Sequence, residues 1–390
     1  MKEQKMTQQY QYDVIVAGGG IAGVNAAVAA AKKGAKTLLL EKSCNLGGLA
    51  TSGLINIFLP LCDGNGHQVT FGLTEELLKR SMIYGPGKVP SDWMEKRDAS
   101  EVERLRCVFS PASMILALEE FLLENNVEIW YDSLITGMEK EGNRIKSLYV
   151  ENTDGRVEVT ANAFVDSTGT ALLAKLVKEE VSYGKNVLSL WALEYEGSCQ
   201  YGRDRMVPDV NMLTRGNAER TFINPTAKDV TSYMVETRTM MRKFYKEQYA
   251  GSSDRFTRWP LFIAAMPQFR KIAALKGKGE ISDNMNNTYF ADSIGLVSDW
   301  RKSGPVWEIP FSTLEAPHTE NLFASGRCIS SVGDAWEITR CIPSAGLTGE
   351  AAGYAAALYK AEERNLLCGK VQSCMEENGN ILHWEEALKA

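Results

Sequence analysis

Cysteine and histidine are scarce in this sequence, and their spacing excludes several kinds of site. The 390 residues contain eight cysteines and three histidines, and no two cysteines form a C-x-x-C pair. Zinc and iron–sulfur sites use closely spaced thiolates or imidazoles, so we expect no metal site. Dithiol relay chemistry, which also needs a close cysteine pair, is not expected either. Cys44 lies in a polar loop, and we expect it to be a small buried residue.

Long apolar runs and blocks of basic residues are also missing. No stretch of 18 or more apolar residues is present, so no membrane-spanning helix is predicted. The first twelve residues are polar and lack the apolar centre of a secretory signal. The net charge of −6 offers no general attraction for nucleic acid or anionic membrane. We therefore expect a cytoplasmic protein with a small-molecule substrate as its partner, and with neither nucleic acid nor membrane as partners. The sequence leaves the oligomeric state open.

The strongest pattern lies in the first fifty residues. A short apolar strand over residues 14–16 precedes a G-x-G-x-x-G sequence at residues 18–23, which opens an alanine-rich helix that ends near residue 33. A second apolar strand over residues 37–40 ends on Glu41. Strand, glycine turn, helix, second strand and acid in this order predict a dinucleotide-binding β-α-β unit. An unrelated glycine-rich turn is the weaker alternative.

Each conspicuous residue of this unit has a physical role if a dinucleotide binds. Gly18 would make the tight turn, Gly20 would let the backbone approach a pyrophosphate, and Gly23 would allow helix and strand to pack closely. The helix N-terminus would attract the phosphates through its free N–H groups. The Glu41 carboxylate would accept hydrogen bonds from both ribose hydroxyls.

The loop that follows Glu41 indicates which dinucleotide. The chain enters a polar, glycine-bearing loop with the sequence GGLATSGLIN at residues 47–56, instead of a further β-α-β unit. This arrangement resembles the FAD-dependent oxidoreductases of the glutathione-reductase-like flavoprotein superfamily. More closely, it resembles the "FAD dependent oxidoreductase" family, which carries GG-x-A/M-T-x-G-L-x-N here and is distantly similar to fumarate reductase flavoproteins. The resemblance implies an α/β fold, with a Rossmann-like FAD-binding domain of the glutathione-reductase type, a β-meander, and a mixed α+β substrate domain.

Two later segments extend the resemblance. The sequence DSTG at residues 166–169 is similar to the D-A-T-G turn by which these flavoproteins return to the nucleotide domain. The sequence NLFASGRCIS at residues 321–330 resembles a second family pattern, and Arg340 and Pro343 fall on the Arg and Pro that follow it. By this resemblance, a helix that begins near Leu347 would direct its N-terminus at the flavin pyrimidine ring.

The resemblance also implies the FAD contacts. Glu41 would bind the adenosine ribose, residues 48–52 would line the pyrophosphate and ribityl region, and Ile135 would lie near the adenine. The expected FAD-binding residues are Gly18, Gly20, Ile21, Ala22, Gly23, Glu41, Lys42, Gly47, Gly48, Ala50, Thr51, Ser52, Ile135, Ser167, Thr168, Gly169, Gly326, Arg327, Pro343, Gly346, Leu347 and Thr348.

The same matches divide the chain into two expected domains. The discontinuous FAD-binding domain would comprise residues 1–62, 105–178 and 320–390, and the substrate or cap domain residues 63–104 and 179–319. Within the cap, a helix over residues 227–249 carries a Met and aromatic stripe that is typical of core packing. Residues 368–390 are expected to form one further helix on the outside.

Further absences narrow the chemistry. No second G-x-G-x-x-G follows a strand, so no separate NAD(P)H domain is expected. The G-D-A-x-H-x-x-x-P stretch of related aromatic hydroxylases is absent, which argues against a monooxygenase. No histidine lies between Glu41 and Phe58, so covalent attachment of FAD in this loop is excluded.

The expected function is hydride transfer between a small organic substrate and non-covalently bound FAD. The family match makes Arg340 the first candidate catalytic residue, and Arg270 is the second. Related proteins often carry a richer arginine cluster near the second position, where this chain has only Arg270 and Lys271. Two alternatives stay open: a flavoprotein that modifies a macromolecule such as tRNA, and a non-catalytic FAD-binding protein.

Overall fold

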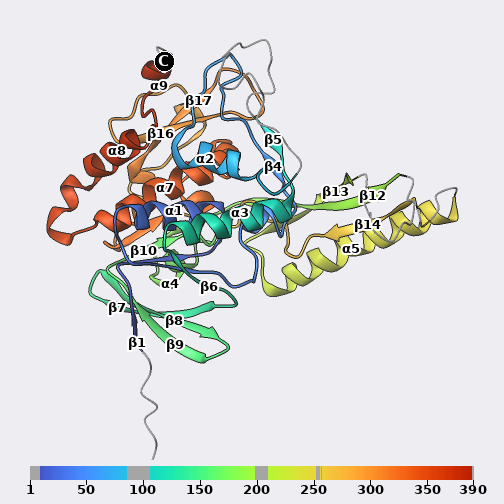
Figure 1. Cartoon of the computed structure of the whole chain (residues 1–390), viewed down its shortest axis with the longest axis horizontal. Coiled ribbons are helices and arrows are strands. Elements are labelled where there is room, and N and C mark those ends of the chain that lie inside the picture. The colour runs from blue at the N-terminus through green and yellow to red at the C-terminus, as the bar shows by residue number, and fades with distance from the viewer. Residues whose placement is uncertain (1–8, 86–105, 198–209, 252–254, 256, 389–390) are drawn as a thin grey trace, which may run out of the picture.

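The computed structural model describes residues 9–85, 106–197, 210–251, 255 and 257–388 (Figure 1). The parts of the expected domains at residues 1–8, 86–105, 198–209, 252–254, 256 and 389–390 therefore lie outside the described residues. A five-stranded parallel sheet forms the centre of the molecule. In spatial order its strands are β18 (Leu322–Ala324), β10 (Ala163–Asp166), β2 (Val14–Ala17), β3 (Thr37–Leu40) and β6 (Glu128–Trp130).

Both faces of the centre of this sheet are buried, and its strands are largely apolar: every residue of β2, β3, β10 and β18 is buried. Side chains of successive strand residues point to opposite faces. Val14, Val16 and Leu39 join the core beneath the helices, whereas Ile15 and Leu38 join a second core on the other face. The sheet is therefore the middle of three layers, as expected for a Rossmann-like nucleotide-binding unit.

Helices cover one face of the sheet. They are α1 (Ile21–Lys32), α2 (Gly72–Arg80), α3 (Pro111–Glu124) and α7 (Ile342–Leu358). The closest approach is between α1 and α7, because a Cβ added at Gly349 would lie 2.2 Å from the carbonyl oxygen of Ala22, and one at Gly353 would lie 2.1 Å from that of Ala26. Only glycine lets the two backbones approach this closely, so these two residues set the distance between the helices.

A β-meander covers the other face (Figure 1). Its strands are β7 (Leu134–Glu141), β8 (Arg144–Asn152) and β9 (Gly155–Thr160), and β1 (Gln9–Gln11) pairs in parallel with β9. Gly142 and Gly155 adopt positive φ angles of 59° and 90° in its two tight turns, which favours glycine at both positions.

An elongated arm extends from this three-layered body (Figure 1). It contains the antiparallel sheet of β12 (Lys185–Glu196), β13 (Val210–Ile223) and β14 (Arg258–Ile263), and the long helix α5 (Ala227–Ala250). A capping box between Thr226 and Asp229 begins the helix. Met241 and Tyr245 of α5 pack on Leu190 of β12, which confirms that the Met and aromatic stripe belongs to the core.

The other α-helices and β-strands of the described residues lie in the body or between the body and the arm. They are β4 (Ile57–Phe58), β5 (Cys107–Val108), α4 (Leu172–Leu176), β11 (Val181–Tyr183), β15 (Ala273–Leu275), β16 (Ser293–Ser298), β17 (Val306–Pro310), α6 (Ala335–Thr339), α8 (Leu367–Glu377) and α9 (Trp384–Ala387). In the described part of the chain, no helix has the length and apolar character needed to cross a membrane. The fold class, α/β with a Rossmann-like unit, a β-meander and a mixed α+β region, agrees with the prediction.

Three local expectations are wrong. The segment after residue 367 is not one helix, because Gly379 adopts a φ of 85° and separates α8 from the short α9. Helix α7 begins at Ile342 instead of near Leu347, because Pro343 is accommodated in its first turn, where no backbone N–H is needed. Cys44 is exposed and not buried.

Candidate functional site

The glycine turn between β2 and α1 is tightly packed on two sides. Gly18 has a φ of 99°, and a Cβ there would lie 2.8 Å from the carbonyl oxygen of Ser167. A Cβ at Gly23 would lie only 1.8 Å from the carbonyl oxygen of Gly18. Both positions therefore require glycine, one for the turn and one for helix–strand packing.

The third glycine of the turn faces open space. A Cβ added at Gly20 would meet no atom within 4 Å, and one at Gly48 would meet only the Cα of Gly20, at 3.6 Å. A bridge between Gly20 and Gly47 holds the loop after β3 against the start of α1. Among the described side chains, none caps the N-terminus of α1, so its N–H groups point toward this opening.

Glu41 lies at the edge of the same opening. Its Oε2 accepts a 2.8 Å hydrogen bond from the Gly19 N–H, and its Oε1 accepts from the N–H and the hydroxyl of Ser43 at 2.9 and 2.8 Å. These bonds fix the carboxylate, and Oε2, which accepts only one of them, retains capacity for a further donor. The opening, the uncapped helix and the fixed acid fit the pyrophosphate and ribose of a dinucleotide.

The DSTG turn is organised from within by its first residue. The buried Asp166 carboxylate accepts hydrogen bonds from the N–H groups of Leu173 and Ala174 at 2.8 and 3.2 Å, and thereby caps α4. It also accepts a 2.7 Å bond from the Thr168 hydroxyl. Burial raises the pKa of Asp166, and these hydrogen bonds partly offset the effect. Asp166 and Thr168 are therefore occupied in shaping the turn.

The turn lies against the segment that follows β18. The hydroxyls of Ser167 and Ser325 are 2.6 Å apart. Gly169 has a φ of 69°, and a Cβ there would lie 2.0 Å from Nη2 of Arg327. The structure thus brings Ser167, Gly169 and Arg327 together, although about 160 residues separate the two segments in sequence.

Arg327 connects this region with the segment that leads out of the arm. Its Nη1 donates to the carbonyl oxygens of Phe269 and Arg270 at 2.6 and 3.5 Å. Burial lowers the pKa of Arg327 to about 10. Carbonyl oxygens are neutral acceptors, so the Arg327 charge has no carboxylate partner among the described ion pairs.

The first turns of α7 contact the glycine segment through small residues. The Gly326 N–H donates a 2.9 Å bond to the Thr348 hydroxyl, and a Cβ at Gly326 would lie 2.8 Å from that of Ala22. Gly346 packs against Asn25 and Thr74. These contacts place Gly326 and Thr348 beside α1, whereas Gly346 has a packing role.

Other predicted FAD-binding residues lie in different surroundings. Lys42 is exposed, Ile135 lies in the core between sheet and meander, and the Leu347 side chain is buried in the helical core. The η1 turn (Gly48–Ala50) carries Ala50 and leads to Thr51, whose hydroxyl donates to the Leu46 carbonyl oxygen. The remaining residues of the predicted set are Ile21 at the start of α1 and Pro343 in the first turn of α7.

The arm contacts the loop after β3 directly. The Ala265 N–H donates a 2.8 Å bond to the carbonyl oxygen of Ser52, and Nε2 of Gln268 donates a 2.5 Å bond to that of Gly53. Backbone groups of the loop therefore serve as acceptors for the segment that follows β14. Sequence reasoning missed both donors, because this segment carries no motif.

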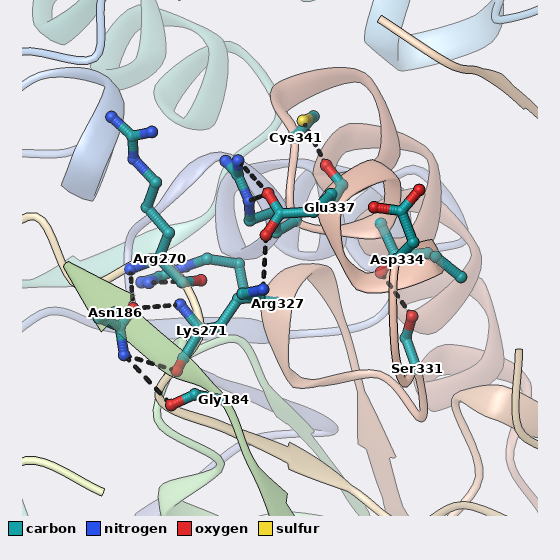
Figure 2. Close-up of polar contacts among 12 residues, drawn as sticks. Gly184, Asn186, Arg270, Lys271, Arg327, Ser331, Asp334, Glu337 and Cys341 are labelled. Atoms are coloured by element: carbon teal, nitrogen blue, oxygen red, sulfur yellow. Dashed lines mark hydrogen bonds and ion pairs between the residues drawn. The ribbon is translucent and has the colours of Figure 1, made fainter. Parts of the chain in front are cut away.

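A charged cluster lies where the arm, α6 and the start of α7 meet (Figure 2). The Glu337 carboxylate pairs with Lys271 Nζ at 2.5 Å and with Nε of Arg340 at 2.7 Å. Burial opposes ionisation of Glu337, but Arg340 and Lys271 outweigh it and lower its pKa. The adjacent thiol of Cys341 is buried, which raises its pKa to about 11, so this cysteine is not a thiolate nucleophile at neutral pH.

Arg270 belongs to the same region but points elsewhere. In Figure 2 its side chain extends away from Glu337. The backbone N–H groups of Arg270 and Lys271 both donate to Oδ1 of Asn186 at 2.8 Å. Burial, followed by the nearby Arg340 charge, lowers the pKa of Arg270. The two predicted catalytic arginines are therefore neighbours, and Asn186 supports one of them without any sequence signal beyond a polar residue beside a predicted strand.

Comparison with known families agrees with this geometry. The family model described as "FAD dependent oxidoreductase" matches residues 13–253 and 284–373. The chain belongs to this family. It is an FAD-dependent oxidoreductase, and FAD is its cofactor. Membership removes the non-catalytic alternative, whereas the substrate is not specified by the family.

Individual relatives of this FAD-dependent oxidoreductase are distant. A digeranylgeranylglycerophospholipid reductase of Picrophilus torridus is 30% identical over 171 residues, which cover 41% of this chain and 40% of the relative. A tRNA uridine 5-carboxymethylaminomethyl modification enzyme of Lactococcus lactis is 29% identical over 46% of this chain and 28% of its own length. The matches thus span less than half of either relative. A solved geranylgeranyl bacteriochlorophyll reductase-like protein from Thermoplasma acidophilum shares 14% identity and a TM-score of 0.46 over 98% of this chain and 88% of its own.

Proposed function

We propose that this oxidoreductase transfers a hydride between a small organic substrate and a non-covalently bound FAD. In this proposal the substrate binds beside the junction between the loop of residues 47–53 and the segment of residues 264–271. The observation that carries it is the pair of hydrogen bonds from Ala265 and Gln268 to Ser52 and Gly53. They hold the cap against the loop that is predicted to contact FAD.

The roles of the chain's own residues follow from their contacts. Bound FAD supplies the hydride acceptor or donor, and the protein supplies position and charge. The opening beside Gly20 would receive the pyrophosphate, and Glu41 would bind the ribose. Arg340, held by Glu337, would position the substrate next to the cofactor. The domain division, the other FAD contacts and the cytoplasmic location stay predictions of the sequence.

An absorption spectrum of the purified protein, before and after acid precipitation, tests the cofactor part. Flavin absorbance that passes into the supernatant is the expected result, because no histidine is available between Glu41 and Phe58 for attachment. Anaerobic addition of candidate small substrates should then bleach the flavin. Flavin that stays in the pellet would contradict non-covalent binding.

Arg340 is tested by Arg340→Met, which removes the charge and keeps an unbranched side chain. We expect reduction of the flavin by substrate to slow by about tenfold or more while FAD stays bound. Stopped-flow absorbance measures the rate, and the flavin-to-protein ratio measures retention. An unchanged rate would remove Arg340 from the site.

Modification of tRNA is the second candidate, and the resemblance to the Lactococcus lactis enzyme favours it. The net charge of −6 argues against strong binding to a polyanion. Filter binding of labelled tRNA at two salt concentrations separates the candidates. Retention that falls steeply with salt, together with transfer of a one-carbon or larger group to the tRNA, would favour this alternative.

A further inference from the structure

Arg270 carries a charge that the described part of the protein does not neutralise. Its Nε is buried and has no hydrogen-bond partner among the described residues. No carboxylate forms an ion pair with its guanidinium within that part of the chain. A guanidinium offers five N–H donors, and donors buried without an acceptor are costly.

The neighbouring charges increase this imbalance. Lys271 and Arg340 share the single carboxylate of Glu337. With Arg270 included, three cations face one anion, which leaves a formal charge of 3 − 1 = +2. Burial is the main cause that lowers the pKa of Arg270, and the nearby Arg340 charge lowers it further, as a like charge does. A group of negative charge would relieve this repulsion.

The backbone that carries Arg270 is held from two sides. Asn186 accepts from the N–H groups of residues 270 and 271, and its own Nδ2 donates a 2.8 Å bond to the Lys271 carbonyl oxygen. On the other side, Arg327 donates to the carbonyl oxygen of Phe269. The guanidinium therefore extends from a fixed base, which reduces the entropy lost when it binds a ligand.

An aromatic wall lies beside the guanidinium. The Cζ of Arg270 is 5.3 Å from the centre of the Trp191 ring. Trp191 lies on β12 between Leu190 and Ala192, which pack in the core against α5, so its side chain lies on the opposite face of the sheet. Phe262 pairs with Leu193 on that same face and is 46% exposed. The face beside Arg270 is therefore apolar and partly uncovered.

We propose that Arg270 binds a carboxylate of the substrate, and that Trp191 packs against the planar or apolar carbons next to that carboxylate. This inference rests on the proposed function and names its substrate class, an organic carboxylate. The planar fork of a guanidinium matches both oxygens of a carboxylate, and a lysine would not provide this match. Arg270 thus binds the carboxylate, whereas Arg340, held in place by Glu337, positions the substrate beside the cofactor as proposed above.

The test is calorimetric titration of the FAD-loaded protein with benzoate, its neutral isostere benzamide, and phenyl phosphate. We expect benzoate to bind about tenfold more tightly than benzamide. Arg270→Gln should weaken benzoate binding by about tenfold or more and leave benzamide within about twofold. Arg220→Gln is the matched control, because Arg220 is an exposed arginine of the same arm, paired with Glu236, and should change neither value.

Trp191 is tested by two variants. Trp191→Ala should weaken benzoate and benzamide binding equally, by about fivefold or more, whereas Trp191→Phe should retain most of the affinity because it keeps an aromatic face. Near-ultraviolet circular dichroism of both variants shows whether the arm stays folded. Loss of benzoate binding in Trp191→Ala, together with its retention in Trp191→Phe, would support the packing of Trp191 against the ligand.

Several outcomes would overturn the inference. Equal binding of benzoate and benzamide would show that charge plays no part, and phenyl phosphate binding more tightly than benzoate would favour a phosphate ligand. Benzoate binding that survives Arg270→Gln would place the carboxylate elsewhere. Titration heats do not depend on turnover, so failure of hydride transfer with intact benzoate binding would count against the proposed function and not against the carboxylate subsite.

Discussion

The two sides of the candidate site are shaped by different kinds of contact. On the side predicted to bind FAD, backbone atoms pack directly against backbone atoms. Gly18, Gly23, Gly349 and Gly353 each leave no room for a Cβ. On the substrate side, charged side chains around Glu337 define the surface. A site shaped by backbone packing requires glycine at fixed positions, so it tolerates few amino-acid substitutions there. A charged site can be altered one residue at a time, which suits a family whose members share a cofactor and differ in substrate.

The largest effect is expected where α1 and α7 touch. The double variant Gly349→Ala/Gly353→Ala places two methyl groups within about 2 Å of α1 carbonyl oxygens. We expect the free energy of unfolding to fall by on the order of 4 kcal/mol, because neither backbone can move without displacing the sheet beneath it. Urea denaturation measures the change.

A helical glycine without such contacts provides the control for that variant. Gly369 lies in α8, and a Cβ there would meet no atom within 4 Å. Gly369→Ala should raise stability by about 0.5 kcal/mol through the lower entropy of the unfolded chain. Equal effects at the two sites would contradict the account of the cofactor side.

Glu350 is an ionisable residue of α7 that lies in sequence between Gly349 and Gly353. Burial raises its pKa to about 7, although it accepts hydrogen bonds from Asn378, Asn380 and the Leu73 N–H. Because the ordinary pKa of a glutamate is 4.5, the folded state binds the proton more tightly than the unfolded state. Its contribution to stability is therefore full below pH 4.5 and is lost as the pH rises toward 7. The shift corresponds to about 3 kcal/mol.

Glu350→Gln, which cannot ionise, should remove this pH dependence. We expect the difference in unfolding free energy between wild type and variant to change between pH 5 and pH 8 in the direction that favours the variant at high pH. Urea denaturation across this pH range measures it. A difference that stays constant with pH would mean that Glu350 is not protonated in the folded protein.

In the charged region, Arg301 can be compared with Arg270, because Arg301 is an arginine with two carboxylate partners. It pairs with the buried Asp299 at 3.0 Å and with Asp334 at 2.6 Å, and these bonds raise its pKa. Arg301→Gln should cost about 2 kcal/mol, because Asp299 would lose its counter-charge. Arg270→Gln should cost less than about 0.5 kcal/mol, because no described carboxylate depends on Arg270. Thermal unfolding of both variants compares them, and equal losses would mean that Arg270 is a structural residue.

The smallest effect concerns Glu41. Glu41→Ala should weaken FAD binding by about tenfold, or ~1.4 kcal/mol, through loss of the ribose contact, while the arm stays folded. Fluorescence titration of deflavinated protein with FAD measures the affinity. Glu139→Ala, on an exposed strand of the meander, is the control. Unchanged FAD affinity in Glu41→Ala would refute the ribose contact.

The part of the fold that was predictable is the part with short-range signals. Residues 14–41 contain a strand, a glycine turn, a helix and a second strand, each specified by neighbours in sequence, and the structure contains all of them. The meander was expected from the family resemblance, and Gly142 and Gly155 lie in its two turns. The family resemblance, which rests on these local motifs, is confirmed by the family match.

The part that was not predictable depends on contacts between distant segments. Arg327 reaches a carbonyl oxygen 58 residues away, and Asn186 reaches one 85 residues away. No local sequence pattern predicts either hydrogen bond. The ion-pair partners of the two arginines were also not readable from sequence, because the Glu337 carboxylate, which pairs with Arg340, could equally have faced Arg270. The role of each FAD contact stays a prediction.

The contact between α1 and α7 has a consequence for synthesis of the chain. Helix α1 is synthesised before its packing partner α7, which begins more than 300 residues later in the chain. Until residue 358 has emerged, the glycine turn at residues 18–23 lacks one of its neighbours and α1 exposes the face that α7 later covers. We therefore expect FAD to be incorporated only after α7 has been synthesised, and truncation before α7 to leave a chain that requires a chaperone.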